Sequence, residues 1–423
     1  MRVLLISANR EDINMPTLPM GLGCVAAATQ QAGHDVTFLD LMLVDDYHQA
    51  LKNRIADFRP DVIGISVRNI DDQAMGSANF MLDQAAEGVG VCRQLSQAPI
   101  VLGGAGYSIF PQSALEYLGA DMGIQGEGEI AFPLLLSQIE QKKDLSTVPG
   151  LYLPGRGQQA ERRFVKNLDT IALPEPSLIM PDRQNRHYWL PFQTRRGCPL
   201  NCSYCSTSTI EGRLIRKRSP EAAVQELAGW IEAGFSQVFF VDNTFNLPET
   251  YAIELCRRIT AVGLKVNWRC IVYPGRVSRT LVEAMAAAGC REVSLGFESG
   301  HHMMLRDMNK QFSPGDIRRT SNMFADAGIR RMGFLLLGGP GETRETVAAS
   351  FDLVESLNLD ALKITVGIRI YPYTKLARIA VEEGRIAADD NLLRPRFYCV
   401  KDLEAWLVKT VAERAEKHRN WYR

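Results

Sequence analysis

Residues 196–205 have the sequence Arg-Gly-Cys-Pro-Leu-Asn-Cys-Ser-Tyr-Cys, which places Cys198, Cys202 and Cys205 at C-x3-C-x2-C spacing. The stretch follows a short strand-like run at 190–194. Such a loop can wrap three thiolates around one small inorganic group. A four-iron four-sulfur ([4Fe–4S]) cluster fits this pattern best, because thiolates are its usual protein ligands and it normally takes four of them. With three cysteines close together, one iron would be left to bind a substrate.

Two simpler interpretations of these cysteines remain open. A structural zinc ion would require four ligands, and the nearest histidine, His187, lies upstream in a connector rich in Pro and Arg. Three cysteines in one loop could also be incidental, since the chain has nine.

Composition limits the class of protein. The 423 residues suffice for two or three domains. Forty-eight basic residues balance 48 acidic ones, which argues against a general nucleic-acid-binding protein. The nine cysteines are odd in number and mostly scattered singly, which favours a reducing compartment over a disulfide framework. Residues 1–7 are too short for a signal peptide, and no apolar run approaches the length of a membrane span. We therefore expect a soluble, cytoplasmic protein.

Residues 1–145 alternate apolar strand-like runs with helical segments, which predicts a doubly wound α/β domain on a five-stranded parallel sheet. Ligands of such sheets bind beyond the carboxyl ends of the strands. The loops at those ends are rich in glycine, which permits positive φ and close approach of the backbone to a large ligand. Tight strand-to-helix turns would use the same glycines. The candidate ligand contacts in these loops are Gly21, Ser66, Val67, Arg68, Gly103, Gly104, Gly126 and Glu127.

A second alternation occupies residues 189–375, after a linker at 146–188 and before a mostly helical tail at 376–423. Six apolar strands are expected there, separated by helices, several of which end at a glycine, the usual C-cap. Ser219-Pro220 provides a matching helix start. Six strand–helix units are too few for a closed eight-fold barrel. In barrels, chemistry gathers at the carboxyl ends of the strands.

The cysteine pattern, its Gly-Cys-Pro start and the aromatic Tyr204 resemble the motif of radical S-adenosylmethionine (SAM) enzymes. Their fold is a (β/α)6 partial barrel, and the open iron of their [4Fe–4S] cluster chelates the amino and carboxylate groups of SAM. The segments 296–300 (Gly-Phe-Glu-Ser-Gly), 308–310 (Met-Asn-Lys) and 338–343 (Gly-Gly-Pro-Gly-Glu-Thr) resemble further segments of these enzymes. The resemblance implies SAM contacts from Tyr204, Asp242, Asn243, Arg269, Glu298 and Ser299.

Physical chemistry allows these roles but does not require them. A carboxylate such as that of Asp242 can accept hydrogen bonds from an ammonium group, and Arg269 can pair with a carboxylate. Structural alternatives are an ion pair within the chain for Arg269 and a helix N-cap for Asn246, which precedes Leu247-Pro248.

Taken together and in this order, the four glycine-rich loops resemble the cobalamin-binding domain of cobalamin-dependent radical SAM enzymes. The glycine-loop candidates would then contact cobalamin. The chain lacks the Asp-x-His-x-x-Gly segment through which many cobalamin proteins ligate cobalt, and Gly106 stands where many relatives have a histidine. Arg68 could approach the lower face of the corrin instead, as a candidate catalytic residue; an exposed loop arginine is the alternative.

Residues 367–374 resemble a Gly-x-Arg-Ile-Tyr-Pro-Gly-Thr pattern of the same enzymes, with Tyr373 in the place of the second glycine. Arg369 and Tyr371 are further candidate catalytic residues, whereas Cys399 is expected to be a packed thiol.

These resemblances imply an enzyme that uses a [4Fe–4S] cluster, SAM and cobalamin to transfer a methyl group to an unactivated carbon or to phosphorus of a small molecule. They also imply an external electron donor of the flavodoxin or ferredoxin type. The alternatives are a radical SAM enzyme that cyclises, rearranges or transfers another SAM-derived group, with or without cobalamin, and a non-catalytic cobalamin or redox sensor.

Overall fold

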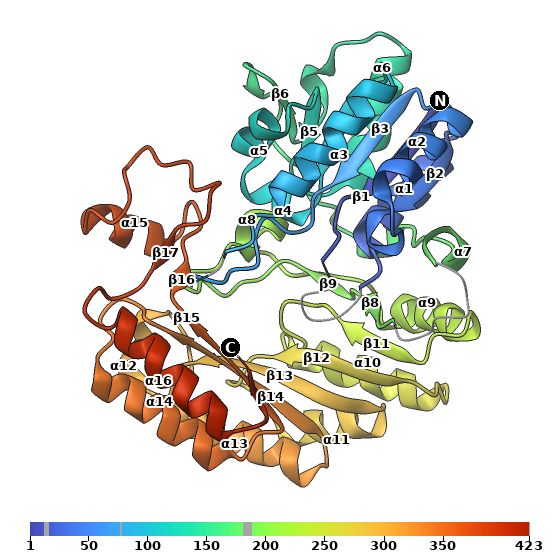
Figure 1. Ribbon diagram of the computed structural model, residues 1–423. Helices are drawn as coiled ribbons and strands as arrows, with labels where there is room; N and C mark the ends of the chain where they lie inside the picture. The colour runs from blue at the N-terminus through green and yellow to red at the C-terminus, as the bar shows by residue number, and fades with distance from the viewer. Residues whose placement is uncertain (12–16, 77, 181–187, 423) are drawn as a thin grey trace. The chain divides into compact units, whose positions relative to one another are not determined.

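The structure is a computed structural model that describes residues 1–11, 17–76, 78–180 and 188–422. His187, the histidine considered for zinc, lies outside these residues. The chain forms two compact units, and each is described by itself. The N-terminal unit comprises Met1–Asp72, Asn79–Trp189 and Thr207–Gly212, and the C-terminal unit comprises Gln73–Ala78, Leu190–Ser206 and Arg213–Arg423. Figure 1 labels their helices and strands.

The N-terminal unit is built on one sheet with strand order β2-β1-β3-β4-β5-β6-β7. The five parallel strands that the sequence predicted are confirmed, and β6 and β7 extend the sheet with antiparallel pairs. These two strands come from the segment predicted as linker, where they are too short to show a hydrophobic period. The strands are β1 (Arg2–Ser7), β2 (Asp35–Asp40), β3 (Val62–Ser66), β4 (Ile100–Gly103), β5 (Met122–Ile124), β6 (Leu151–Leu153) and β7 (Gly157–Gln158).

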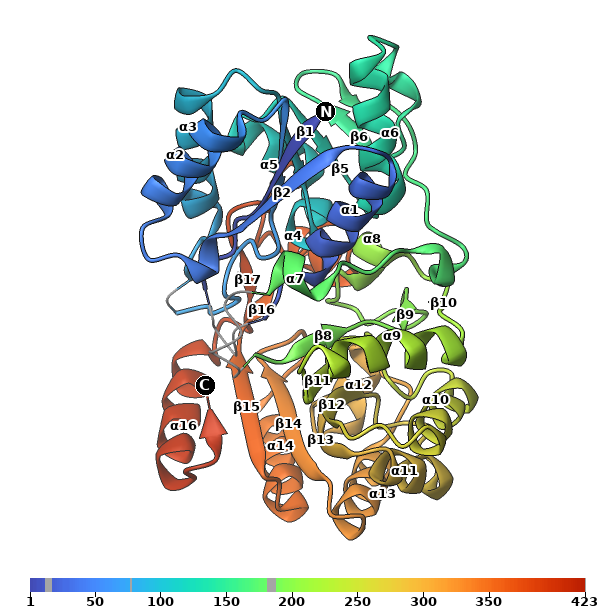
Figure 2. The same cartoon turned by 90° about the vertical axis from the view of Figure 1, so that its right-hand side faces the viewer.

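Helices cover both faces of this sheet, with α1 and α6 on one side and α2 and α3 on the other (Figure 2). The strand residues Val3, Leu5 and Val62 are fully or almost fully buried against Ala26 of α1 and Leu135 of α6. The helices are α1 (Met20–Gln31), η1 (Leu41–Leu43), α2 (Tyr47–Phe58), α3 (Leu82–Leu95), α4 (Ala105–Ile109), α5 (Pro111–Leu118), α6 (Gly128–Glu140), η2 (Leu145–Thr147), η3 (Leu168–Thr170), α7 (Pro176–Ile179) and α8 (Thr207–Glu211).

The C-terminal unit contains a second parallel sheet, with strand order β18-β15-β14-β13-β12-β11-β8. Its first six strands in the chain lie side by side in sequence order, as an open six-unit partial barrel requires, and β18 from the tail adds an edge strand. The strands are β8 (Leu190–Phe192), β11 (Gln237–Phe240), β12 (Asn267–Val272), β13 (Cys290–Glu298), β14 (Arg330–Leu337), β15 (Ala361–Val366) and β18 (Trp421–Tyr422). Two short antiparallel pairs join β9 (Arg195–Arg196) to β10 (Arg216–Lys217) and β16 (Ile368–Arg369) to β17 (Phe397–Tyr398).

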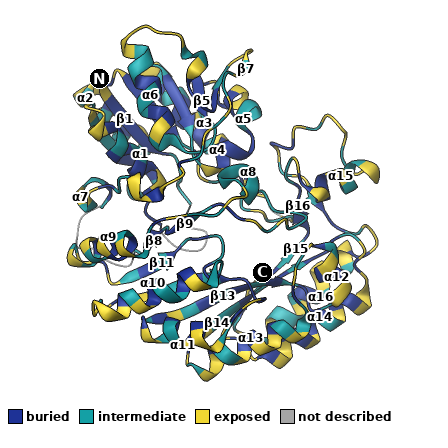
Figure 3. Cartoon of the chain, turned by 180° about the vertical axis from the view of Figure 1, so that it is seen from behind, coloured by how far each residue is buried: buried dark blue, intermediate teal, exposed yellow. Residues whose placement is uncertain are grey.

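Burial alternates along the strands of this sheet, which Figure 3 shows as dark blue and teal segments. On β12, Trp268, Cys270 and Val272 are fully buried, whereas Arg269 and Ile271 between them are half-buried. Since successive side chains point to opposite faces, one face packs on helices and the other is partly open. The helices are α9 (Pro220–Glu232), α10 (Glu249–Ala261), α11 (Arg279–Ala287), α12 (His302–Asp307), α13 (Pro314–Asp326), α14 (Arg344–Leu357), α15 (Lys375–Glu382) and α16 (Glu404–Lys417).

Side-chain caps set several helix starts in this unit. Ser219 accepts a hydrogen bond from the backbone N of Ala222 with Pro220 at the first helical turn, as the sequence predicted. Thr343 caps α14 in the same way. No helix in the described part of the chain is both long and apolar enough to span a membrane.

Candidate functional site

The cysteine loop, residues 197–206, follows β8 and β9 at one edge of the C-terminal sheet. Cys198 is buried, and Cys202 and Cys205 are half-buried. None of the nine cysteines, all of which are described, forms a disulfide. The loop therefore presents three reduced thiols within one short segment.

Later segments of the chain hold this loop through hydrogen bonds, three of which come from beyond residue 300. The backbone N of Ser203 donates to the carbonyl of Met308 (3.1 Å), and its carbonyl accepts from the backbone N of Leu376 (2.9 Å). The Nδ2 of Asn309 donates to the carbonyl of Asn201 (2.6 Å). The loop conformation thus depends on residues more than 100 positions away in the sequence.

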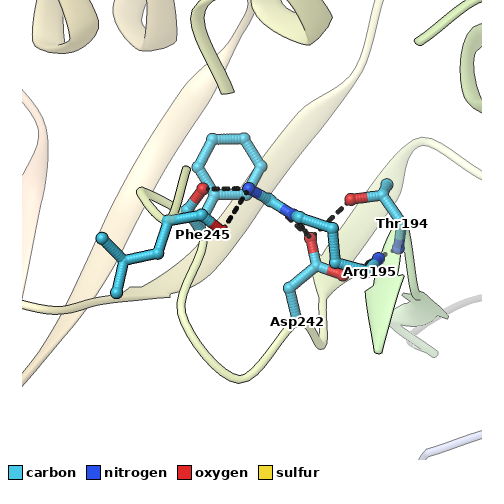
Figure 4. Close-up of polar contacts among 5 residues, drawn as sticks. Thr194, Arg195, Asp242 and Phe245 are labelled. Atoms are coloured by element: carbon cyan, nitrogen blue, oxygen red, sulfur yellow. Dashed lines mark hydrogen bonds and ion pairs between the residues drawn. The ribbon is translucent and has the colours of Figure 1, made fainter. Parts of the chain in front are cut away.

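A buried ion pair fixes the approach to the loop (Figure 4). The Oδ2 of Asp242 lies 2.8 Å from the Nη2 of Arg195, and both side chains are almost completely buried. The Asp242 carboxylate also accepts hydrogen bonds from the backbone N and Oγ1 of Thr194 and from the backbone N and Nε of Arg195. The Nη1 of Arg195 donates to the carbonyls of Phe245 and Leu247. Both oxygens of Asp242, a predicted SAM contact, are therefore engaged within the chain.

Glu298 and Lys310 form a second polar group next to the cysteine loop. Glu298 lies at the end of β13, after a register shift, with a φ of +67°. The Nζ of Lys310 donates to Oε1 of Glu298 (3.3 Å) and to the carbonyl of Gly296 (3.2 Å), and it lies 5.5 Å from the centre of the Tyr204 ring. Burial alone would lower the pKa of Lys310, but Tyr204, Glu298 and Cys202 together raise it well above its usual value.

The remaining predicted SAM contacts lie on the same unit. Asn243 follows Asp242 in the loop after β11 and is half-buried. The Nη1 of Arg269 lies 3.7 Å from Oε1 of Glu292, its register partner on β13. The Oγ of Ser299 lies 3.2 Å from the Oγ of Ser350 on α14, and Ser299 is almost fully buried. Ser299 therefore ties the end of β13 to a helix.

The side chain of Arg369, a candidate catalytic residue, makes contacts within the chain and does not lie open to a ligand. Its Nη1 donates to the carbonyl of Ile370 (2.8 Å), and its Nη2 donates to those of Leu392 (2.9 Å) and Leu393 (3.3 Å). The guanidinium lies 5.2 Å from the ring centre of Tyr371. Arg369 is buried on β16, directly after β15. Its contacts therefore fasten the tail segment near residue 392 to the chain at the end of β15.

The carboxyl edge of the N-terminal sheet carries a polar row. Asp40, Ser7, Ser66 and Gly103 end four adjacent strands and are register neighbours. Asp40 is buried, and its Oδ2 has no hydrogen-bond partner. Burial raises the pKa of Asp40 to about 6, although the Ser7 hydroxyl, a backbone N–H and the charge of exposed Arg68 all lower it.

Two of the predicted cobalamin-contact glycines, Gly104 and Gly126, adopt positive φ. Gly104 has a φ of +101°, and a Cβ there would lie 2.5 Å from the carbonyl of Val67. Only glycine allows the two loops to approach this closely. Gly126 has a φ of +94° and donates its N–H to the Oγ of Ser108 (2.9 Å).

The last two predicted cobalamin contacts differ in their surroundings. Glu127 accepts a hydrogen bond from the backbone N of Val165 through Oε2 (2.6 Å), so its carboxylate helps to fold the following segment. Gly21 on α1 is exposed and has open space at its Cβ position. The carboxyl edge of the N-terminal sheet thus combines polar side chains at the strand ends with glycine backbone that carries no side chain.

Two family models match two separate parts of the chain. Residues 193–354 match the radical SAM superfamily, and residues 6–136 match the B12 binding domain. The chain belongs to the radical SAM enzymes that carry a B12-binding domain. Its cysteine loop and its glycine-rich sheet edge fall within these matched regions.

Several relatives of this radical SAM chain cover most of its length. It is 28% identical to an uncharacterised methyltransferase of Pyrococcus horikoshii over 90% of this chain and 83% of the relative. It is 25% identical to the tryptophan 2-C-methyltransferase of Streptomyces laurentii over 90% and 74%. A solved structure of the radical SAM methyltransferase TsrM from Kitasatospora setae, with tryptophan and a SAM analogue bound, matches with a TM-score of 0.82 and 25% identity over 90% of this chain and 76% of that chain.

The cysteine loop of this radical SAM unit has the donor set that a [4Fe–4S] cluster requires. Its three thiols are reduced and lie in one loop. Within the described ranges, no group of three or more His, Cys, Asp or Glu side chains could hold a metal ion. A cluster does not need that convergence, because each thiolate binds a different iron.

The sequence did not reveal the contacts of three residues of the radical SAM unit. Arg195 and Lys310 had no assigned role. Asn246 was considered as a helix N-cap, and this was wrong: α10 has Pro248 at its N-cap position. The buried Asn246 instead pairs its Nδ2 with the carbonyl of Tyr273 and its Oδ1 with the backbone N of the same residue, both at 2.9 Å. All three roles depend on partners distant in sequence.

Proposed function

We propose that this protein is a cobalamin-dependent radical SAM methyltransferase that delivers a methyl group from SAM, through cobalamin, to carbon or phosphorus of a small molecule. The observation that carries this proposal is the combination, in one chain, of a three-cysteine radical SAM loop and a B12-binding domain. Relatives named as methyltransferases support it, including one that acts on cytidylyl-2-hydroxyethylphosphonate.

Cys198, Cys202 and Cys205 would hold the cluster. When bound, the cluster supplies an electron to SAM, and cobalamin carries the methyl group. The chain itself binds, orients and shields these groups. Cys198 is buried, and hydrogen bonds from later segments hold the loop in place.

Tyr204, Asn243, Arg269 and Glu298 remain our candidates for contacts to SAM. Their positions support this role, because they lie in the cysteine loop, after β11, on the half-buried face of β12 and at the end of β13. Asp242 and Ser299 are better suited to position the backbone, since both are almost fully buried and both oxygens of Asp242 and the hydroxyl of Ser299 bind within the chain.

For cobalamin, we propose contacts from the strand ends and loops of the N-terminal sheet. Exposed Arg68 is the candidate to contact the lower face of the corrin. Gly103 and Gly104 are candidates to contact the corrin through their backbone. Arg369 is proposed as an anchor of the tail, whereas Tyr371 beside it remains a candidate at the rim of the substrate site.

The proposed partners are a small-molecule substrate, with no nucleic acid, and an external one-electron donor of the flavodoxin or ferredoxin type. A cytoplasmic location belongs to the same proposal and is supported by nine cysteines without a disulfide.

Cofactor retention is the first test. The protein is reconstituted without oxygen with iron, sulfide and hydroxocobalamin, gel-filtered, and analysed for iron and by visible and EPR spectroscopy. We expect about four irons and one cobalamin per chain. Cys202→Ser should lose iron, and Cys92→Ala, which removes a buried thiol on α3, should retain it.

Product analysis follows with methyl-labelled SAM and a panel of small molecules that includes tryptophan and phosphonates. Under our proposal, the transfer of label from SAM to a product requires both the cluster and cobalamin. Four irons without cobalamin would overturn the route through cobalamin and leave group transfer from SAM alone.

A further inference from the structure

The segment Met308-Asn309-Lys310-Gln311 packs against the cysteine loop from the side of β13. Met308 accepts from the backbone N of Ser203, and Asn309 donates to the carbonyl of Asn201. The backbone N of Gln311 donates to the phenol of Tyr273 (2.7 Å), which fixes the far end of the segment. The intervening Lys310 is therefore held at a defined position by residues on both sides.

Lys310 is a buried cation. Its side chain is 5% exposed, and Glu298, its ion-pair partner, is 14% exposed. Its Nζ lies 5.5 Å from the centre of the ring of Tyr204, which stands between Cys202 and Cys205 in the sequence. Placing an ammonium group out of water is unfavourable unless negative charge compensates it. Glu298 supplies one such charge at 3.3 Å, and a cluster held by the neighbouring thiolates would supply another.

Arg195, a second buried cation of this unit, is paired more closely than Lys310: its Nη2 and Nε lie 2.8 and 3.2 Å from Oδ2 of Asp242, against 3.3 Å between Lys310 and Glu298. It is paired with Asp242, which shares its burial and balances its charge. A cluster held by three thiolates is itself anionic, and one-electron reduction makes it more so. In a poorly solvated site, a fixed positive charge stabilises the reduced state more than it would in water.

We infer that Lys310 is a positioning residue that holds the cysteine loop against β13 and raises the reduction potential of the cluster bound there. The inference rests on the proposed function, because it requires a cluster at Cys198, Cys202 and Cys205. The step concerned adds one electron to the oxidised cluster, takes no proton, and draws the electron from an external reductant, which is dithionite in the test.

The test compares the reconstituted wild-type protein with Lys310→Met, Lys310→Gln and Lys310→Arg. The Gln variant can still donate a hydrogen bond to Gly296, so it keeps a neutral variant available if Lys310→Met does not fold. Lys375→Met is the matched control, because Lys375 is exposed at the start of α15, next to Leu376, which also contacts the loop. Iron content, circular dichroism and an EPR-monitored potential titration are measured for each.

We expect the neutral variants to fold. The reduction potential of their cluster should be more negative than that of the wild type by about 59 mV, which is a tenfold change in the equilibrium for a one-electron couple. Loss of iron from both neutral variants, with iron retained in Lys310→Arg, would also support the inference. The reduction potential and iron content of Lys310→Arg should be close to those of the wild type, and those of Lys375→Met should be the same as in the wild type.

Unchanged potential and iron content in the neutral variants would overturn the inference while leaving the proposed function intact. A shift of equal size in Lys375→Met would overturn it as well, because the effect would then not require a buried charge. Failure of the wild-type protein to bind iron would instead overturn the proposed function.

Discussion

The carboxylate of Asp242 and the guanidinium of Arg195 form a buried ion pair of 2.8 Å between residues 47 positions apart. Asp242 follows β11, and Arg195 precedes Cys198, the first cysteine of the loop, by three residues. The pair therefore sets the direction in which the chain leaves β8 and enters the loop. Its contacts with Thr194 and with two carbonyls satisfy most of the remaining polar atoms around it.

Asp242→Ala should destabilise the chain strongly, by about 3–5 kcal/mol, because it leaves the buried charge of Arg195 unpaired. Urea unfolding measures this change. Glu413→Ala removes the acid of an exposed pair with Lys409 and should change stability by less than about 0.5 kcal/mol. Equal effects in the two variants would contradict the assignment of Asp242 as a positioning residue.

Stability should depend on pH through Asp40. Its pKa is raised to about 6 in the folded chain from 3.8, so the folded state holds this proton more tightly than the unfolded chain does. The stability from this proton is present below about pH 4 and is lost as pH rises through about 6.

Asp40→Asn should therefore melt higher than the wild type at pH 7.5 and close to it at pH 4.5, with a gain of up to about 3 kcal/mol for a shift of about two pKa units. Differential scanning calorimetry across this range measures the effect. Asp35→Asn, on an exposed residue of the same strand, is the control. A constant difference at all pH values would show that Asp40 does not titrate as described.

Tyr373 carries a backbone strain that its side chain does not offset. It has a φ of +63° and is 91% exposed. Since residues with a Cβ disfavour this region, Tyr373→Gly should stabilise the chain by about 0.5–1 kcal/mol. Tyr373→Ala keeps the strain and should give no such gain. Thermal unfolding of the Gly and Ala variants measures the difference. Similar melting temperatures for the two variants would contradict backbone strain at Tyr373.

Gly104 and Gly103 should respond differently to alanine. Gly104→Ala forces a Cβ to 2.5 Å from the carbonyl of Val67 at positive φ, so we expect loss of more than about 2 kcal/mol. The nearest atom to a Cβ at Gly103 lies 4.0 Å away, so Gly103→Ala should fold normally. Reduced retention of hydroxocobalamin by folded Gly103→Ala would support close approach of the ligand there, and unchanged retention would oppose it.

The sequence by itself determined the features that depend on neighbouring residues. The spacing of Cys198, Cys202 and Cys205, the five parallel strands before residue 145 and the six after residue 189 could be predicted, because hydrophobic period and turn residues act over a few positions. The Ser219 cap could be predicted for the same reason.

Only the tertiary structure decided what the polar residues near the cysteine loop do. Asp242 contacts Arg195, Asn246 contacts Tyr273, and Lys310 meets Glu298 beside a loop more than 100 residues earlier. A motif gives the type of residue at a strand end, but burial and pairing decide whether its charge faces a ligand or another part of the chain. These pairings arise when the parallel strands come together, so no local pattern contains them.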